Sequence, residues 1–192
     1  MENYYQTNFN EYHKRTFLVD SSSFLEPFVK VLPPGTSVLD VGCGSGRDIL
    51  WLKNMGFKPT GFEQSPGLAA LARKHTGCKV IEGDFETYNF STFKFYAILA
   101  SGSMVHVPHN RLRRVIQKIR PALDRNGIFY ISLKQGENTK TDNLNRTFYL
   151  WQDNDLKQLF SDLNFELLHS SNTKSVLNSK DLWLGYVLMQ TR

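Results

Sequence analysis

The residues with the clearest chemical purpose lie in residues 38–48, where an apolar strand leads into glycines at alternate positions, Gly42, Gly44 and Gly46. Glycine lets the backbone turn sharply and approach a ligand closely, because no Cβ stands in the way. A helical pattern follows at once, so backbone N–H groups and a helix N-terminus point at the same place. The segment therefore predicts a nucleotide or nucleoside site at the carboxyl end of a first strand.

Two carboxylates that follow later strands suit the hydroxyls and the amine of an adenosine group. Glu63 ends a second predicted strand, and its two oxygens match the two adjacent O–H donors of a ribose. Asp84 follows a third strand, where it would accept a hydrogen bond from an adenine amine with Phe85 beside the ring. The alternatives are a solvent-facing Glu63 and a turn or helix-cap Asp84. Dinucleotide sites share the ribose contact, but their fingerprint has glycine where this chain has Arg47.

Taken together, these segments resemble the class I S-adenosylmethionine-dependent methyltransferase family. The resemblance spans roughly residues 20–190, and five segments in order carry it: 38–46, 61–65, 83–85, 98–108 and 119–128. It implies S-adenosyl-L-methionine as cofactor and S-adenosyl-L-homocysteine as product. Two departures stand out. Tyr96 replaces an aspartate that is common in the fourth strand, and residues 125–127 replace a double glycine, although Asn126 tolerates the positive φ of a turn.

The resemblance also implies which residues bind the cofactor. The methionine portion would lie on the glycine turn, the ribose on the second-strand glutamate, the adenine beyond it, and the sulfonium near the end of the fourth strand. In that order, the candidates are Asp40, Gly42, Cys43, Gly44, Gly46 and Arg47; Glu63; Gln64, Ser65, Asp84 and Phe85; and Ala100 and Ser101. Arg47 would pair with the methionine carboxylate, with an outward-facing arginine as the alternative.

His106 is the candidate catalytic residue. It follows the fourth strand at the carboxyl edge of the sheet, and the ordinary histidine pKa near 6.5 suits proton transfer at neutral pH. The alternative is a structural histidine that caps the next helix. The aromatic N-terminus, with Tyr4, Tyr5 and Tyr12, is expected to cover the cofactor, or else to pack on the surface in the ordinary way. No metal site is expected.

Positioning these residues requires strands that alternate with helices, and the chain shows that alternation. Strands are predicted over 36–41, 58–62, 79–81, 95–100, 128–133, 165–169 and 183–190, helices over 48–55, 67–75, 110–123 and 153–163, and a turn over 124–127. Because the last two strands are joined without a helix, they favour an antiparallel hairpin. We therefore expect an α/β three-layer sandwich with a seven-stranded, mainly parallel sheet and an antiparallel terminal hairpin. Residues 1–192 would form a single methyltransferase domain, with residues 1–30 as an N-terminal cap.

Composition is typical of a globular protein, with 192 residues, 41% of them hydrophobic. No apolar run approaches the ~20 residues of a membrane span, and the N-terminus does not have the pattern of a signal peptide. Cys43 and Cys78 are expected to be reduced thiols of a cytoplasmic protein with no membrane partner. The net charge of +5 permits an anionic partner without requiring one.

The acceptor class follows from what the chain carries and what it does not carry. Base-amine methyltransferases have an Asp/Asn-Pro-Pro-aromatic motif where residues 100–103 read Ala-Ser-Gly-Ser. A small-molecule acceptor with an oxygen, nitrogen or sulfur nucleophile is therefore preferred. Nucleic acid remains possible but is not favoured: the basic helix 110–123 is a solvated face or, alternatively, a contact for RNA or protein substrates. A non-catalytic S-adenosylmethionine-binding module and an NAD-dependent oxidoreductase are further alternatives. The oligomeric state is not fixed.

Overall fold

One seven-stranded sheet organises the protein, and the computed structural model describes residues 4–178 and 180–191 of it. The strand order is β3-β2-β1-β4-β5-β9-β8. The strands are β1 (Ser37–Val41), β2 (Lys58–Glu63), β3 (Val80–Glu82), β4 (Phe95–Ser101), β5 (Leu123–Lys134), β8 (Phe165–Lys174) and β9 (Leu182–Gln190). The first five of these strands run parallel, and β9 is antiparallel to both β5 and β8. The predicted mainly parallel sheet with a terminal antiparallel hairpin is therefore confirmed.

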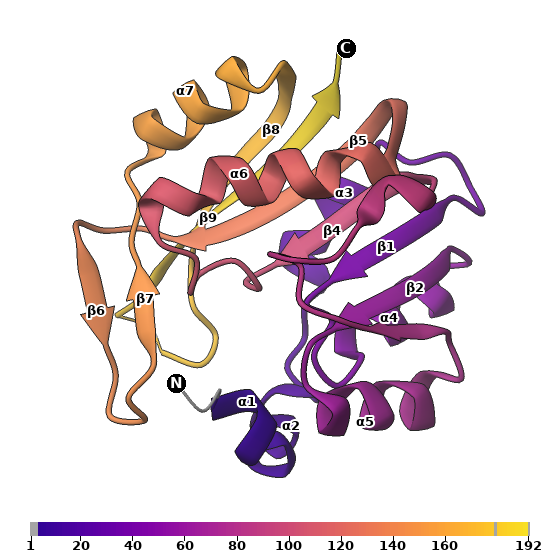
Figure 1. Ribbon diagram of the computed structural model, residues 1–192, viewed down its shortest axis with the longest axis vertical. Coiled ribbons are helices and arrows are strands. Elements are labelled where there is room, and N and C mark those ends of the chain that lie inside the picture. Colours follow the sequence, from indigo (N-terminus) through magenta and orange to yellow (C-terminus); the bar gives the residue numbers. More distant parts are fainter. Residues whose placement is uncertain (1–3, 179, 192) are drawn as a thin grey trace.

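Helices cover both faces of the sheet and complete the three layers (Figure 1). The helices are α1 (Tyr4–Thr7), α2 (Phe9–Thr16), α3 (Ser22–Val29), α4 (Arg47–Asn54), α5 (Pro66–Thr76), α6 (His109–Ile119) and α7 (Asp153–Asp162). The cores show which face each helix covers: α6 and α7 pack on one face, and α3 and α4 on the other. Helices α1 and α2 lie at one end of the sandwich, where they contact α5.

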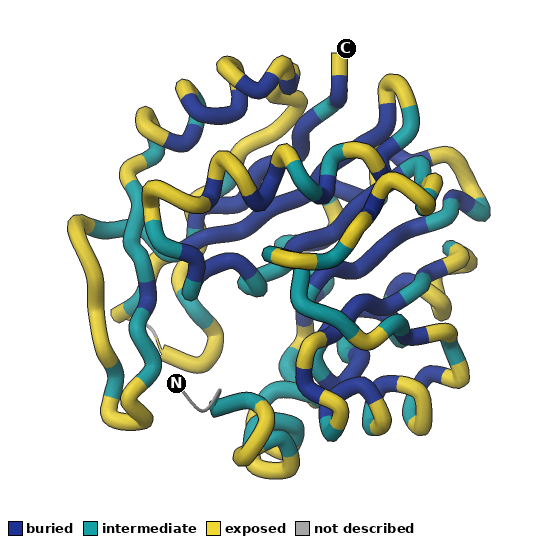
Figure 2. Tube along the Cα trace, viewed as in Figure 1, coloured by how far each residue is buried: buried dark blue, intermediate teal, exposed yellow. Residues whose placement is uncertain are grey.

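In the central strands, successive apolar side chains point to opposite faces of the sheet, so each strand packs against helices on both sides. In β4, Ala97 and Leu99 pack toward α3 and α4, whereas Ile98 and Ala100 pack toward α6. All four side chains are buried, as expected of a parallel strand covered on both sides. Figure 2 shows the same arrangement for the whole sheet, with buried strands between helices whose outer surfaces are exposed.

Three predicted features differ from the structure. The basic helix ends at Ile119 and continues only as a 3-10 turn over Arg120–Ala122, because Pro121 lacks an N–H donor and stops an α-helix. The predicted turn at 124–127 is a bulge inside β5, with Asn126 at a φ of 56°. Strand β8 extends to Lys174, which shortens its connection to β9.

A small hairpin that the sequence analysis did not predict follows β5. Its strands, β6 (Thr139–Thr141) and β7 (Thr147–Tyr149), pair antiparallel and form a separate two-stranded sheet at the side of the molecule (Figure 1). The N–H of Tyr149 donates to the carbonyl of Val105 at 2.8 Å, so the hairpin is attached to the loop after β4. Within residues 4–178 and 180–191, no helix is long and apolar enough to cross a membrane.

Candidate functional site

The glycine turn joins β1 to α4 and is tied directly to the neighbouring strand. The N–H groups of Gly42 and Cys43 both donate to the carbonyl of Phe62, at 2.7 and 3.1 Å. Gly42, Gly44 and Gly46 all have positive φ, and the last of them precedes the first residue of α4. A Cβ on Gly42 would overlap the Cβ of Ser103, so the turn packs tightly against the loop after β4.

Glu63 closes this turn from the end of β2. Its Oε2 accepts the N–H of Gly44 and its Oε1 accepts the N–H of Ser65, both at 2.8 Å. The side chain is 7% exposed, and burial raises the pKa of its carboxyl while these hydrogen bonds lower it. Ser65 caps α5 and donates from its hydroxyl to the carbonyl of Tyr5, whereas Gln64 lies exposed beside it. The acid thus organises the turn and retains acceptor capacity for a ligand.

Two further carboxylates lie beneath the turn. Asp40 is 2% exposed, and burial, with the nearby charge of Asp48, raises its pKa well above the usual range. Its Oδ2 has no hydrogen-bond partner among the described residues. Arg47 forms a two-point ion pair with Asp48, at 2.7 and 2.9 Å. This end of the site therefore presents a buried, unsatisfied acceptor next to a satisfied pair.

Not every residue of the predicted set points its side chain at the turn. The thiol of Cys43 is buried within the small core formed by α4 and α5, so only its backbone belongs to the turn. Ala100 is buried beneath α6, whereas Ser101 lines a cavity. Asp84 accepts the N–H of Glu86 at 2.8 Å in a turn, and Phe85 packs beside the core. The N–H of the preceding Gly83 donates to the carbonyl of Glu63, which places that turn at the same sheet edge.

A cavity of about 370 Å³ adjoins the glycine turn, a size typical of small-molecule sites. Helices α1 and α2 line it with Tyr5 and Tyr12, and the ring of Tyr12 lies 3.5 Å from a Cβ built on Gly44. Tyr4 is not a lining residue; its ring packs on Tyr5 and beneath the guanidinium of Arg146. Tyr12 of the aromatic N-terminus therefore lies beside Gly44 of the turn.

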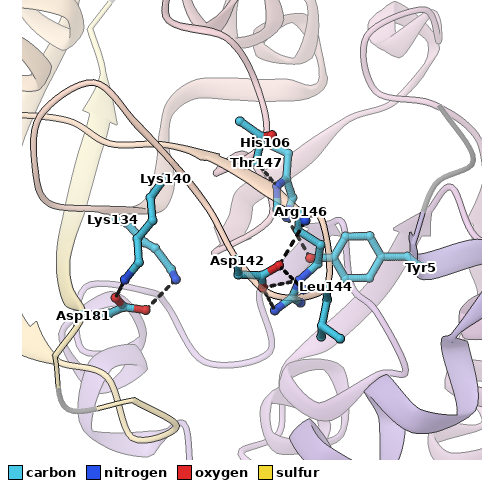
Figure 3. Close-up of polar contacts among 9 residues, drawn as sticks. All are labelled: Tyr5, His106, Lys134, Lys140, Asp142, Leu144, Arg146, Thr147 and Asp181. Carbon is cyan, nitrogen blue, oxygen red and sulfur yellow. Dashed lines mark hydrogen bonds and ion pairs between the residues drawn. The ribbon is translucent and has the colours of Figure 1, made fainter.

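His106 connects this N-terminal cover to the β6–β7 hairpin (Figure 3). Its Nδ1 lies 2.6 Å from the carbonyl of Thr147, and because a carbonyl only accepts, Nδ1 carries the proton. Nε2 is then an acceptor, and the hydroxyl of Tyr5 donates to it at 2.8 Å. Burial lowers the pKa of His106, which keeps the imidazole neutral at pH 7. The arrangement suits a base, and Tyr5 stands between that base and the cavity.

The charged residues of the opposite wall of the cavity were not among the predicted site residues. Lys134 ends β5 and pairs with Asp181, Lys140 pairs with the same carboxylate, and Arg146 pairs with Asp142. All five line the cavity. Lys134 was detectable, because it lies at the carboxyl end of a strand, the edge that also carries the glycine turn. The others lie in a hairpin and in a loop, for which no periodic pattern exists. Within the described part of the chain, no cluster of three or more His, Cys, Asp or Glu side chains could hold a metal ion.

Comparisons with known proteins point to one family. A family model described as a methyltransferase domain matches residues 38–127. The chain is 36% identical over 108 residues to the sterol 24-C-methyltransferase ERG6B of Gibberella zeae, an alignment that covers 51% of this chain and 27% of that protein. It is 26% identical over 110 residues to the carboxy-S-adenosyl-L-methionine synthase of Campylobacter jejuni subsp. doylei, covering 55% and 47%. The chain thus spans less than half the length of these curated relatives.

Solved structures share the fold over nearly the whole chain. The 1,6-didemethyltoxoflavin-N1-methyltransferase of Burkholderia thailandensis, with bound 1,6-didemethyltoxoflavin and S-adenosylhomocysteine, superposes with a TM-score of 0.76 at 17% identity. That superposition covers 98% of this chain and 84% of the other. The glycopeptide N-methyltransferase MtfA complexed with S-adenosylmethionine superposes with a TM-score of 0.69 at 17% identity, covering 89% and 95%. At this level of identity, the likeness concerns the fold.

Proposed function

Because the chain carries the methyltransferase domain of the class I S-adenosylmethionine-dependent family, we propose that it transfers the methyl group of S-adenosyl-L-methionine to a small molecule. The acceptor atom is an oxygen, nitrogen or sulfur. One observation carries the proposal: a cavity of about 370 Å³ is lined by Arg47, directly after the glycine turn, and by Tyr5 and Tyr12 of α1 and α2. A cavity of that size suits a small acceptor. The Burkholderia relative, solved with a small acceptor, has the same fold.

The residues at the glycine turn fit the cofactor. The unsatisfied Oδ2 of Asp40 is a buried acceptor suited to the ammonium of a methionine group. Each oxygen of Glu63 accepts one backbone N–H and keeps a lone pair for a ribose hydroxyl. Asp84 and Phe85 would flank the adenine. When bound, S-adenosylmethionine supplies a methyl group that its sulfonium charge already activates.

The chain's own residues then orient the acceptor and hold its proton. His106 Nε2 is the position for that proton, since Nδ1 is committed to the carbonyl of Thr147. Tyr5 occupies Nε2 with its own hydroxyl in the covered cavity, and burial raises the pKa of that phenol, so it remains a donor. An O–H or N–H group of the acceptor would take the place of the Tyr5 hydroxyl. A neutral imidazole there accepts a proton at neutral pH.

An RNA- or protein-directed enzyme is less well supported, because several cations of α6 have partners within the chain. Arg111 pairs with Glu86 at 2.8 Å and Arg113 pairs with Asp162 at 2.6 Å. Lys118 donates to the carbonyl of Thr87. A helix whose charges are neutralised in this way attracts phosphates weakly. A binding module without catalysis differs from the proposed enzyme only in turnover, which an acceptor panel measures.

Calorimetry with S-adenosylhomocysteine tests the proposal. The wild-type protein should bind it, and Glu63→Ala should weaken binding at least about 100-fold, because two buried N–H groups and the ribose lose their acceptor. Gly44→Val should abolish binding, because its φ of 56° disfavours a branched side chain. Glu166→Gln, at an exposed site on β8, is the control. Heat with NAD and none with S-adenosylhomocysteine would refute the assignment.

A further inference from the structure

The wall of the cavity opposite the glycine turn carries more positive than negative charge. We call Lys134, Lys140 and Arg146 the basic wall. Asp181 accepts hydrogen bonds from both lysines, at 2.7 and 2.8 Å, and Asp142 pairs with the arginine at 2.6 Å (Figure 3). These three cations therefore share two carboxylates, and Lys174 lines the same cavity, so positive charge on this side exceeds negative charge.

Lys134 is the most enclosed of these cations. Its side chain is 12% exposed, and its Nζ lies 3.9 Å from the ring centroid of Phe148 and 5.6 Å from that of Trp183. The faces of the two rings stabilise the ammonium without neutralising it. An ammonium has three N–H donors, and the hydrogen bond to Asp181 uses one of them. The lysine is thus held charged beside two aromatic surfaces.

The opposite end of the same site carries the opposite charge. Asp40, Asp48 and Glu63 lie at or beneath the glycine turn, and Arg47 is the cation paired there, with Asp48. This end suits a cationic donor, since sulfonium and ammonium groups are both positive. The basic wall would repel the same cation. The charges therefore favour a cationic donor at the glycine turn and an anionic ligand at the basic wall.

We propose that the methyl acceptor is a small aromatic carboxylate, which binds with its carboxylate at Lys134 and Lys140 and its ring against Trp183. The inference rests on the proposed function and adds the substrate class. The excess positive charge of the wall suits a carboxylate. Trp183, a half-buried residue that lines the cavity, supplies the apolar contact that a ring requires.

Three probes of one shape and different charge test the proposal by calorimetry on protein saturated with S-adenosylhomocysteine. These probes are 4-hydroxybenzoate, the neutral 4-hydroxybenzamide and the cationic 4-hydroxybenzylamine. We expect heat from the carboxylate and none from the amine, with the amide at least about tenfold weaker than the carboxylate. Equal or tighter binding of the amide or the amine overturns the inference, as does failure of all three to bind at millimolar concentration.

Two substitutions that should change the affinity in opposite directions test whether the basic wall binds the carboxylate. Asp181→Asn removes a competing carboxylate and should tighten binding of 4-hydroxybenzoate several-fold, whereas Lys134→Gln should weaken it about tenfold. Lys140→Gln, at a half-exposed site, should weaken it several-fold and keeps the test available if the Lys134 variant does not fold. Lys157→Gln, on α7, is the matched control and should change nothing. An Asp181→Asn variant that folds and binds the carboxylate no more tightly than wild type also overturns the inference.

The first titration separates the two proposals. If S-adenosylhomocysteine itself gives no heat, the proposed function fails and this inference fails with it. If S-adenosylhomocysteine binds and the three probes are not distinguished by charge, the substrate class alone is wrong.

Discussion

The two ends of the cleft are constructed in different ways. At the glycine turn, one short segment supplies the shape, and Glu63 fixes it through two backbone N–H groups. At the basic wall, Lys134, Asp142 and Asp181 come from β5, a hairpin and the loop before β9, and side-chain ion pairs hold them together. The shape of a turn held by backbone contacts depends little on which side chains surround it. A pair of side chains, by contrast, is removed by a single substitution. The difference places a turn built from backbone contacts beside a wall built from side-chain pairs.

Gly42→Ala should have the largest effect, since the glycine turn has no room for an added side-chain atom. Its φ of 77° and the overlap with Ser103 would displace the turn, which should cost on the order of 2–4 kcal/mol of stability and abolish S-adenosylhomocysteine binding. Gly35→Ala is the matched control, because Gly35 has a similar φ of 72° with no atom within 4 Å of its Cβ. That variant should lose about 1 kcal/mol and bind normally. Thermal melts and calorimetry compare the two; equal losses would show that strain alone matters.

Asp40→Asn tests the acidic residues at the glycine turn, because it should raise stability and weaken ligand binding. Burial raises the pKa of Asp40, so the folded protein resists its ionisation, and stability is lost as pH rises from the unfolded-state pKa near 3.8 through the raised value. The asparagine removes that loss and should raise the melting temperature of the ligand-free protein at pH 7. It should also weaken S-adenosylhomocysteine binding about tenfold, because an ammonium loses its partner. Glu11→Gln is a surface control. A variant that is less stable and binds normally contradicts this role.

Tyr5→Phe tests the link between the two ends. It leaves His106 Nε2 without the donor of its 2.8 Å hydrogen bond, which should cost about 1 kcal/mol and speed proteolysis between α2 and α3. With an acceptor bound, kcat should change little, because the acceptor replaces the phenol at Nε2, while His106→Asn should reduce kcat strongly. A Tyr5→Phe variant that loses kcat as fully as His106→Asn would make the tyrosine itself the proton carrier.

Acidification should loosen the cover over the turn and leave the basic wall intact, the smallest of these effects. The rings of His13 and His75 stack at 4.6 Å between α2 and α5, and burial, followed by the charge of His75, lowers the pKa of His13. Because that pKa lies below the unfolded value near 6.5, stability falls as pH drops below about 6.5. The pKa of Asp142 is lowered by hydrogen bonds from Arg146, so that pair stays ionised at pH 5. Protection factors, which correct hydrogen exchange for its intrinsic dependence on pH, should therefore fall several-fold in α2 between pH 7 and 5.5, and not in the hairpin.

His13→Phe is the matched variant for this pH effect. A phenyl ring keeps the stack on His75 and cannot be protonated, so the protection factors of α2 should lose their pH dependence. Exchange in α6, which has no part in the stack, is the internal reference. An unchanged profile in the variant would assign the effect to another group.

Local signals predicted the parts of the fold where one pattern decides the outcome. The apolar runs gave β1 and β4, and the glycine positions gave the turn, because positive φ at Gly42, Gly44 and Gly46 requires those residues. The turn predicted at 124–127 became a bulge, since strand pairing with β4 overrode local turn chemistry. The β6–β7 hairpin was missed because its strands are three residues long and lie outside the core.

The sequence by itself determined the class of fold and the glycine turn, where a strand, three glycines and an acid after the next strand are consecutive or nearly so. Only the tertiary structure decided which end of His106 is an acceptor, that Arg47 is paired with Asp48, and that Lys134 and Lys140 share Asp181. The physical reason is range. Backbone conformation depends on neighbours in the chain, whereas the charge of a cavity wall depends on side chains that only the packed sheet brings within hydrogen-bond distance.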